Sequence, residues 1–175
     1  TVVSLTADSP VIIDSTSRWR FDYWDVDGTS KGAGVNPITV TMNDAHTATA
    51  HYVKQYLVTF DHTGLDGSAS GVVVTVDGSA KTYGDLPFSK WVDKDTTVSY
   101  SYEPIVSSSD AGKRFRLDSV TGPSSPITVT DSVTVTGNYV VQYYLTVKTD
   151  PEDLVAISGE DWYDECTTVT LTAPA

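Results

Sequence analysis

The sequence predicts an all-β fold of tandem small antiparallel β-sandwich-like repeat domains, with half repeats at both termini. Val, Thr and Tyr are abundant whereas Leu and Ala are sparse, apolar and polar residues alternate along short segments, and several motifs recur in the same order. Branched and aromatic side chains favour strands, and alternation with a period of two gives each strand one face for a core. Short strands separated by frequent turns are typical of sandwich-like domains.

The expected strands lie between turns that contain glycine, aspartate or proline, such as Asp27-Gly28 and Asp77-Gly78. Alternation in the strand expected at 18–24 places Trp19, Phe21 and Tyr23 on one face and Trp24 on the other. No segment combines a helical period with caps, so we expect no helix. The expected strands are 2–7, 18–24, 37–42, 46–52, 55–60, 71–76, 80–83, 90–92, 97–102, 114–117, 127–130, 133–136, 143–147 and 168–173.

Self-comparison of the chain indicates an internal repeat, because several segments match in the same order. The matched pairs are Arg20-Phe21 with Arg114-Phe115, 36–41 with 125–130, 49–52 with 136–139, 55–58 with 143–146, 91–98 with 162–169, and 3–7 with 169–173. These matches divide the chain into three parts. Residues 1–53 are the C-terminal half of a repeat, residues 54–140 are a complete repeat, and residues 141–175 are the N-terminal half of a further repeat.

A half repeat cannot bury its apolar face or satisfy its edge strands. The aromatic residues of the first half, Trp19, Phe21, Tyr23 and Trp24, are therefore expected to face water unless a complement covers them. Three arrangements supply a complement. The two halves close on each other within one chain, the last half completes residues 1–53 of a neighbouring chain, or the chain is an excerpt from a longer array.

The order of the motifs resembles a known family. The order is Tyr144-Leu145-Thr146-Val147, Gly159, Trp162-Tyr163 and 168–173, continued in the first copy by Arg20-Phe21, Trp24, Gly28, 37–40 and 48–52. It resembles a divergent internalin-type B repeat of prokaryotic cell-surface proteins, and the first copy is similar to archaeal sequences. The middle repeat departs from the pattern, with Asp118 at the position matched to Trp24. The resemblance implies an extracellular or cell-surface location and no reaction.

We expect an extracellular structural protein, a pilus-like subunit of a surface filament or repeat stalk. Other copies of the chain are the expected partners, joined head to tail by donor-strand complementation, because two different surfaces in contact give an open polymer. The alternative is an adhesin or carbohydrate-binding module of a larger surface protein, with surface glycans as partners. The residues expected to make the assembly contact are Val3, Leu5, Trp19, Phe21, Tyr23, Val169, Leu171 and Ala173.

Charge and motifs argue against other classes of function. The formal net charge of -12 disfavours binding to nucleic acid, and no apolar run is long enough for membrane insertion. No nucleophile elbow, histidine pair with zinc spacing or phosphate loop occurs, so we expect no enzyme and no cofactor. Asp25 and Asp27 precede Gly28 in a segment that favours a turn, and a calcium site at these two carboxylates is the alternative.

Overall fold

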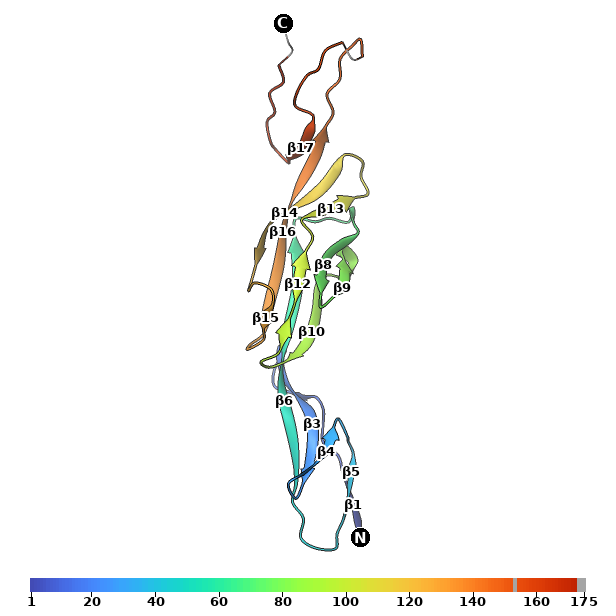
Figure 1. The fold of residues 1–175 in the computed structure, drawn as a ribbon, viewed down its shortest axis with the longest axis vertical. Helices are drawn as coiled ribbons and strands as arrows, with labels where there is room; N and C mark the ends of the chain where they lie inside the picture. Colours follow the sequence, from blue (N-terminus) through green and yellow to red (C-terminus); the bar gives the residue numbers. More distant parts are fainter. Residues whose placement is uncertain (153, 173–175) are drawn as a thin grey trace. The chain divides into compact units, whose positions relative to one another are not determined.

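The computed structural model describes residues 1–152 and 154–172 (Figure 1). Within these ranges the fold is all-β, as predicted, with several sheets and one short 3₁₀ turn at Tyr83–Asp85. No helix in the described part of the chain is long and apolar enough to cross a membrane. The strands are β1 (Val2–Leu5), β2 (Val11–Ile12), β3 (Ser17–Val26), β4 (Thr29–Ala33), β5 (Ile38–Thr41), β6 (Ala48–Thr63), β7 (Ala69–Ser70), β8 (Val72–Val76), β9 (Ser79–Thr82), β10 (Phe88–Asp93), β11 (Thr97–Val98), β12 (Tyr100–Tyr102), β13 (Ile105–Ser108), β14 (Lys113–Thr121), β15 (Ile127–Thr128), β16 (Val133–Leu145) and β17 (Asp161–Asp164).

The chain forms two compact units, each of which contains segments that are distant in the sequence. The first unit consists of Thr1–Val58, Ser89–Thr97 and Thr128–Val133, and the second of Thr59–Phe88, Val98–Ile127 and Thr134–Ala175. The long strands β6 and β16 each contribute to both units. The sequence-predicted repeat boundaries at 53/54 and 140/141 fall inside these two strands.

In the first unit β3 is the central strand. It pairs antiparallel with β6, with β2 and with β4, and β10 pairs with β6. A separate two-stranded sheet joins β1 to β5, with Val3 opposite Val40 and Leu5 opposite Ile38.

A β-bulge in β3 decides which aromatic side chains enter the core of the first unit. The pairing of β3 with β6 shifts register between Phe21 and Tyr23, so Trp24 returns to the face of Phe21. The prediction that Trp24 lies on the opposite face is therefore wrong. The core cluster that results consists of Ala7, Phe21, Trp24, Val26, Ile38 and Val40.

The aromatic residues of the first half are largely buried by the chain itself. Phe21 is 5% exposed and Trp24 is 8% exposed, and the Tyr23 ring stacks on His51 with centroids 4.4 Å apart. The expectation that an incomplete half leaves Phe21 and Trp24 in water is wrong, because β1 and β5 fold over the bulged strand. Trp19 is the exception, with 39% of its surface exposed.

The second unit has a larger core. β14 pairs with β16 and β13, β13 pairs with β7, and a three-stranded sheet has the order β12-β8-β9. Phe60, Val73, Val106 and Phe115 are each at most 1% exposed. The buried Tyr102 hydroxyl donates to the carbonyl oxygen of Asp61 at 2.7 Å, so its polar group is satisfied. β17 pairs with the last four residues of β16, Gln142–Leu145.

The strand pattern differs from the expectation in several places, and the strand expected at 97–102 is two strands, β11 and β12, in different sheets. The pairs of strands expected at 46–52 and 55–60, and at 133–136 and 143–147, are single strands of 16 and 13 residues. Neither intervening segment contains a proline that would interrupt pairing. The strand expected at 168–173 has no strand pairing over its described residues 168–172, and Ala173 lies outside the described residues.

Candidate assembly surfaces

A network of polar side chains fastens β10 to β3 and β6 in the first unit. Arg20 makes a bidentate contact with Asp93, from Nη2 to Oδ2 at 2.8 Å and from Nε to Oδ1 at 3.3 Å. The Nε2 atom of Gln55 donates to Asp93 Oδ1 at 2.7 Å, and its Oε1 atom accepts from Arg18 Nε at 2.7 Å. The Arg18 guanidinium lies 4.3 Å from the ring centroid of Trp91. The half-buried charges are therefore compensated by directed contacts.

The second unit contains a network of the same residue types at the same distances. Arg116 contacts Asp164 at 2.8 and 3.3 Å, Gln142 donates to Asp164 at 2.7 Å, and Gln142 accepts from Arg114 at 2.7 Å. The Arg114 guanidinium lies 4.3 Å from the ring centroid of Trp162. This network fastens β17 to β14 and β16, as the first fastens β10 to β3 and β6.

Both networks stabilise the ionised carboxylates. The hydrogen bond from Arg20, together with that from Gln55, lowers the pKa of Asp93 despite partial burial, which acts in the opposite direction. The hydrogen bonds from Arg116 and Gln142 lower the pKa of Asp164 in the same way. One face of the Trp91 indole and one face of the Trp162 indole each carry a guanidinium group, which leaves those faces less suited to stack on a sugar ring.

The contacts agree with the match of 91–98 with 162–169, because Trp91 and Asp93 have the roles of Trp162 and Asp164. They shift the match of 55–58 with 143–146 by one residue, because Gln55 has the role of Gln142, and they shift the arginine match by two residues. They give Arg18 the role of Arg114 and Arg20 the role of Arg116, whereas the matched letters aligned Arg20 with Arg114. Each strand contains an arginine–aromatic–arginine triplet, so a match on one arginine and phenylalanine selects the wrong arginine. The two buried glutamines, one on each long strand, are the signal that sequence reasoning missed.

The first unit carries an exposed apolar hollow, which we call the open face. It has a volume of about 470 Å³ and is lined by Val11, Trp19, Ala50, His51 and Tyr52. Val11 is 42% exposed and Trp19 is 39% exposed. Of the residues predicted for assembly, Trp19 lies in this face. Val11 and His51 could not be identified from the sequence, because the hollow forms only when β2, β3 and β6 are paired.

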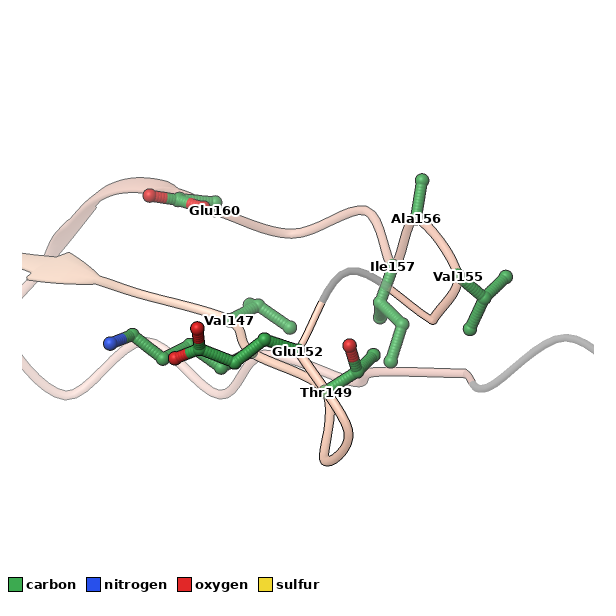
Figure 2. Close-up of a pocket in the computed structure, with 8 residues that line it drawn as sticks. Val147, Thr149, Glu152, Val155, Ala156, Ile157 and Glu160 are labelled. Carbon is green, nitrogen blue, oxygen red and sulfur yellow. The ribbon is translucent and has the colours of Figure 1, made fainter.

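The segment between β16 and β17, residues 146–152 and 154–160, which we call the tail loop, lacks strand pairing. Leu154 is 69% exposed and Val155 is 42% exposed. A hollow of about 360 Å³ lies within this segment, and Figure 2 shows the side chains that line it. Val147, Ile157 and Glu160 are among them. The tail loop therefore presents apolar side chains without a core.

The described part of the predicted last strand, residues 168–172, which we call the donor segment, follows β17. Val169 is half-buried and Leu171 is 44% exposed. Both line a hollow of about 400 Å³ with Tyr143 and Tyr163. Of the other predicted assembly residues, Val3 and Leu5 lie in β1 against β5, and Phe21 and Tyr23 lie in the first unit's own packing.

Asp25 and Asp27 form part of a hydrogen-bonded turn between β3 and β4. Asp25 Oδ1 accepts from the Gly28 amide at 2.8 Å, and Asp27 Oδ1 accepts from the Thr47 amide at 2.8 Å. Asp27 Oδ2 lies 2.6 Å from His46 Nδ1, and these two partners lower the pKa of Asp27. Across the described ranges no group of three acidic, histidine or cysteine residues is placed to hold a metal ion. The turn accounts for both carboxylates, and calcium binding there stays a prediction.

Comparison with known proteins finds no matching family model, and neither the curated proteins nor the solved structures contain a significant match. The resemblance to the internalin-type B repeat therefore stays a prediction from the motifs.

Proposed function

We propose that the chain is an extracellular structural subunit whose copies join head to tail, by exchange of one β-strand, into a surface filament or stalk. In this account residues 54–140 are one complete β repeat, and residues 1–53 and 141–175 are half repeats. The observation that carries it is the donor segment, which repeats the apolar pattern of β1 but has no strand partner among the described residues. The extracellular setting rests on the family resemblance alone.

The middle of the chain shows what partner such a segment takes. β11 follows β10 after a turn in which Asp95 has a φ of 63°, and it pairs with β15. The donor segment follows β17 after a turn in which Cys166 has a φ of 67°. The two turns and the two preceding strands correspond through the polar networks. The missing partner of the donor segment is therefore a strand of the β15 or β5 type.

β5 of another copy supplies that strand if its own β1 is displaced. β1 places Val3 opposite Val40 and Leu5 opposite Ile38, and the donor segment offers Val169 and Leu171 at the same spacing. The exchange replaces β1 on β5 by a donor segment with the same apolar spacing, so it contributes little net free energy by itself, as in domain swapping. Because the donor and the acceptor are different surfaces, each copy binds one neighbour at each end, which allows an open filament to grow.

The first experiment removes the donor. A chain without residues 168–175 is expected to stay monomeric in sedimentation velocity and to form no filaments in electron micrographs, whereas the full chain polymerises. Unchanged polymers from the truncated chain would reject strand donation.

The second experiment closes the acceptor. Ser4 and Thr39 are opposite each other across β1 and β5, and both are exposed. A disulfide in Ser4→Cys/Thr39→Cys, made in a Cys166→Ser background, holds β1 on β5. We expect the oxidised variant to be monomeric and the reduced variant to polymerise. Equal polymerisation in both states would show that β1 is not displaced.

A further inference from the structure

We infer that the open face of the first unit is the docking site for the tail loop of a second copy. The inference rests on the proposed head-to-tail assembly and names the two surfaces, besides the exchanged strand, that meet in it. Five apolar or aromatic residues of one copy and the exposed apolar side chains of the other are then buried together.

The second unit contains a closed counterpart of the open face. There Val106 lies opposite Phe115 in the pairing of β13 with β14, and in the first unit Val11 lies opposite Trp19 in the pairing of β2 with β3. The next pair along is Ser107 with Arg114 in one unit and Ile12 with Arg18 in the other. The two arginines occupy equivalent positions in the polar networks, which fixes this correspondence independently.

The two faces differ in what covers them. Val106 is 1% exposed and Phe115 is 0% exposed, whereas Val11 and Trp19 are 42% and 39% exposed. In the second unit we assign the cover to the segment between β6 and β10, in which Val73 and Val74 are fully buried. Its strand β7 pairs with β13, and its strand β8 pairs with β12.

Two tyrosines show the difference at atomic scale. Tyr139 lies opposite Leu117, and its hydroxyl lies 2.9 Å from the carbonyl oxygen of Glu103 and 3.2 Å from that of Val73, in β8. Its counterpart Tyr52 lies opposite Phe21, and its hydroxyl lies 3.0 Å from the carbonyl oxygen of Asp8. The first unit thus has the receiving half of the arrangement, but among its described residues no strand takes the place of β8.

In the sequence, the tail loop corresponds to the segment that covers the second unit. In the second unit the cover connects β6, which carries Gln55, to β10, which carries Asp93. The tail loop connects β16, which carries Gln142, to β17, which carries Asp164. These are the two corresponding pairs of network strands, so the tail loop occupies the same place in its half repeat.

The occupant is a second copy because of the donor segment. Only β17 and one turn separate the tail loop from residues 168–172. A copy that places its donor segment on β5 therefore brings its tail loop to the same first unit. Burial of Val147, Leu154, Val155 and Trp19 then provides the net free energy that exchange of the strand alone lacks.

The first test places a charge in each surface. Val11→Asp and, separately, Leu154→Asp are expected to raise the dissociation constant of the full chain at least about tenfold, because a carboxylate would be buried without a partner. Val35→Asp is the matched control: Val35 is 45% exposed in the first unit but is not part of the open face, and its substitution should leave assembly unchanged. Equal affinity in all three variants would overturn the inference.

The second test uses the wild-type chain, which removes any effect of a substitution on folding. Hydroxyl-radical footprinting read by mass spectrometry compares monomer with polymer. Trp19 and Leu154 are expected to lose about nine-tenths of their reactivity on assembly, as full burial requires, while Val35 keeps its reactivity. Polymers in which Trp19 and Leu154 stay reactive would reject this docking but leave strand exchange standing. A chain that forms no polymer would reject both.

Discussion

The carboxylates of Asp93 and Asp164 each hold a short edge strand to a long one. Each accepts hydrogen bonds from one arginine and one glutamine, and each arginine also bonds the backbone carbonyl of the next residue. Because Gln55 and Gln142 are both 7% exposed, loss of a carboxylate leaves a buried amide short of a partner.

We predict that Asp93→Asn lowers the free energy of unfolding by about 1 kcal/mol, since the ion pair with Arg20 is lost from a half-exposed site. Urea denaturation followed by circular dichroism measures the change. Asp95→Asn is the control, because it removes an exposed carboxylate whose Oδ2 atom lies 3.6 Å from Lys94 Nζ and which is not part of the network. A difference of less than about 0.3 kcal/mol between the two variants would contradict the structural role given to the network.

A second prediction at this scale concerns acid. Hydrogen bonds from Lys113 and Ser68 lower the pKa of Asp66 from 3.8 to about 2. A lowered carboxyl pKa stabilises the fold above the pKa of the unfolded chain, and this contribution disappears as pH falls from about 4 to about 2. Asp66→Asn should therefore flatten the acid limb of a stability-against-pH curve. Parallel curves for the variant and the wild type over this range would contradict the assignment.

At the scale of elements, most of the strands could be predicted, because alternation and turn residues are local signals. The missed strands β2, β4, β7, β13 and β17 have two to five residues each. Each exists by pairing with a longer neighbour, and all five residues of β4 are exposed. Such strands are too short for the alternation of apolar and polar residues that a sequence displays over a longer strand.

The candidate site was predictable only in part for a related reason. The pattern identified Trp19 and the donor segment, but it misplaced Trp24, because a bulge shifts the alternation by one residue at Tyr23. The open face joins residues from three strands, so it depends on tertiary pairing. In the N-terminal half the expected exposure of the aromatic residues is found at Trp19, whereas Phe21 and Trp24 are buried. In the described part of the C-terminal half, the tail loop and the donor segment stay without strand pairing.

The bulge leads to a prediction about two tryptophans of the same strand. Trp24 is buried in the core, and Trp24→Ala should lower the free energy of unfolding by about 3 kcal/mol or more through the cavity it leaves. Trp19→Ala should cost the monomer less than about 1 kcal/mol but weaken assembly. Thermal melts of dilute monomer, paired with sedimentation at high concentration, separate the two effects. The reverse order of monomer stabilities would contradict the bulged register.

At the scale of the whole molecule, association has to overcome charge. Each copy has a formal net charge of -12, so copies repel one another at low ionic strength. Salt has little effect on contacts between apolar faces and on backbone hydrogen bonds, whereas it screens the repulsion between the negatively charged copies. We predict that polymer length, measured by light scattering, increases between about 10 and about 300 mM salt. Dissociation on addition of salt would indicate instead that ion pairs hold the copies together.

Head-to-tail assembly requires that the donor segment of one copy binds β5 of another copy and that no other pair of surfaces joins the chains. The most direct test mixes two blocked chains: the oxidised Ser4→Cys/Thr39→Cys/Cys166→Ser variant, whose acceptor is closed, and the chain truncated before residue 168, which has no donor. Sedimentation velocity should show each variant alone as a monomer and their equimolar mixture as a dimer that grows no further. Self-association of either variant alone, or a mixture that remains monomeric, would contradict head-to-tail strand exchange.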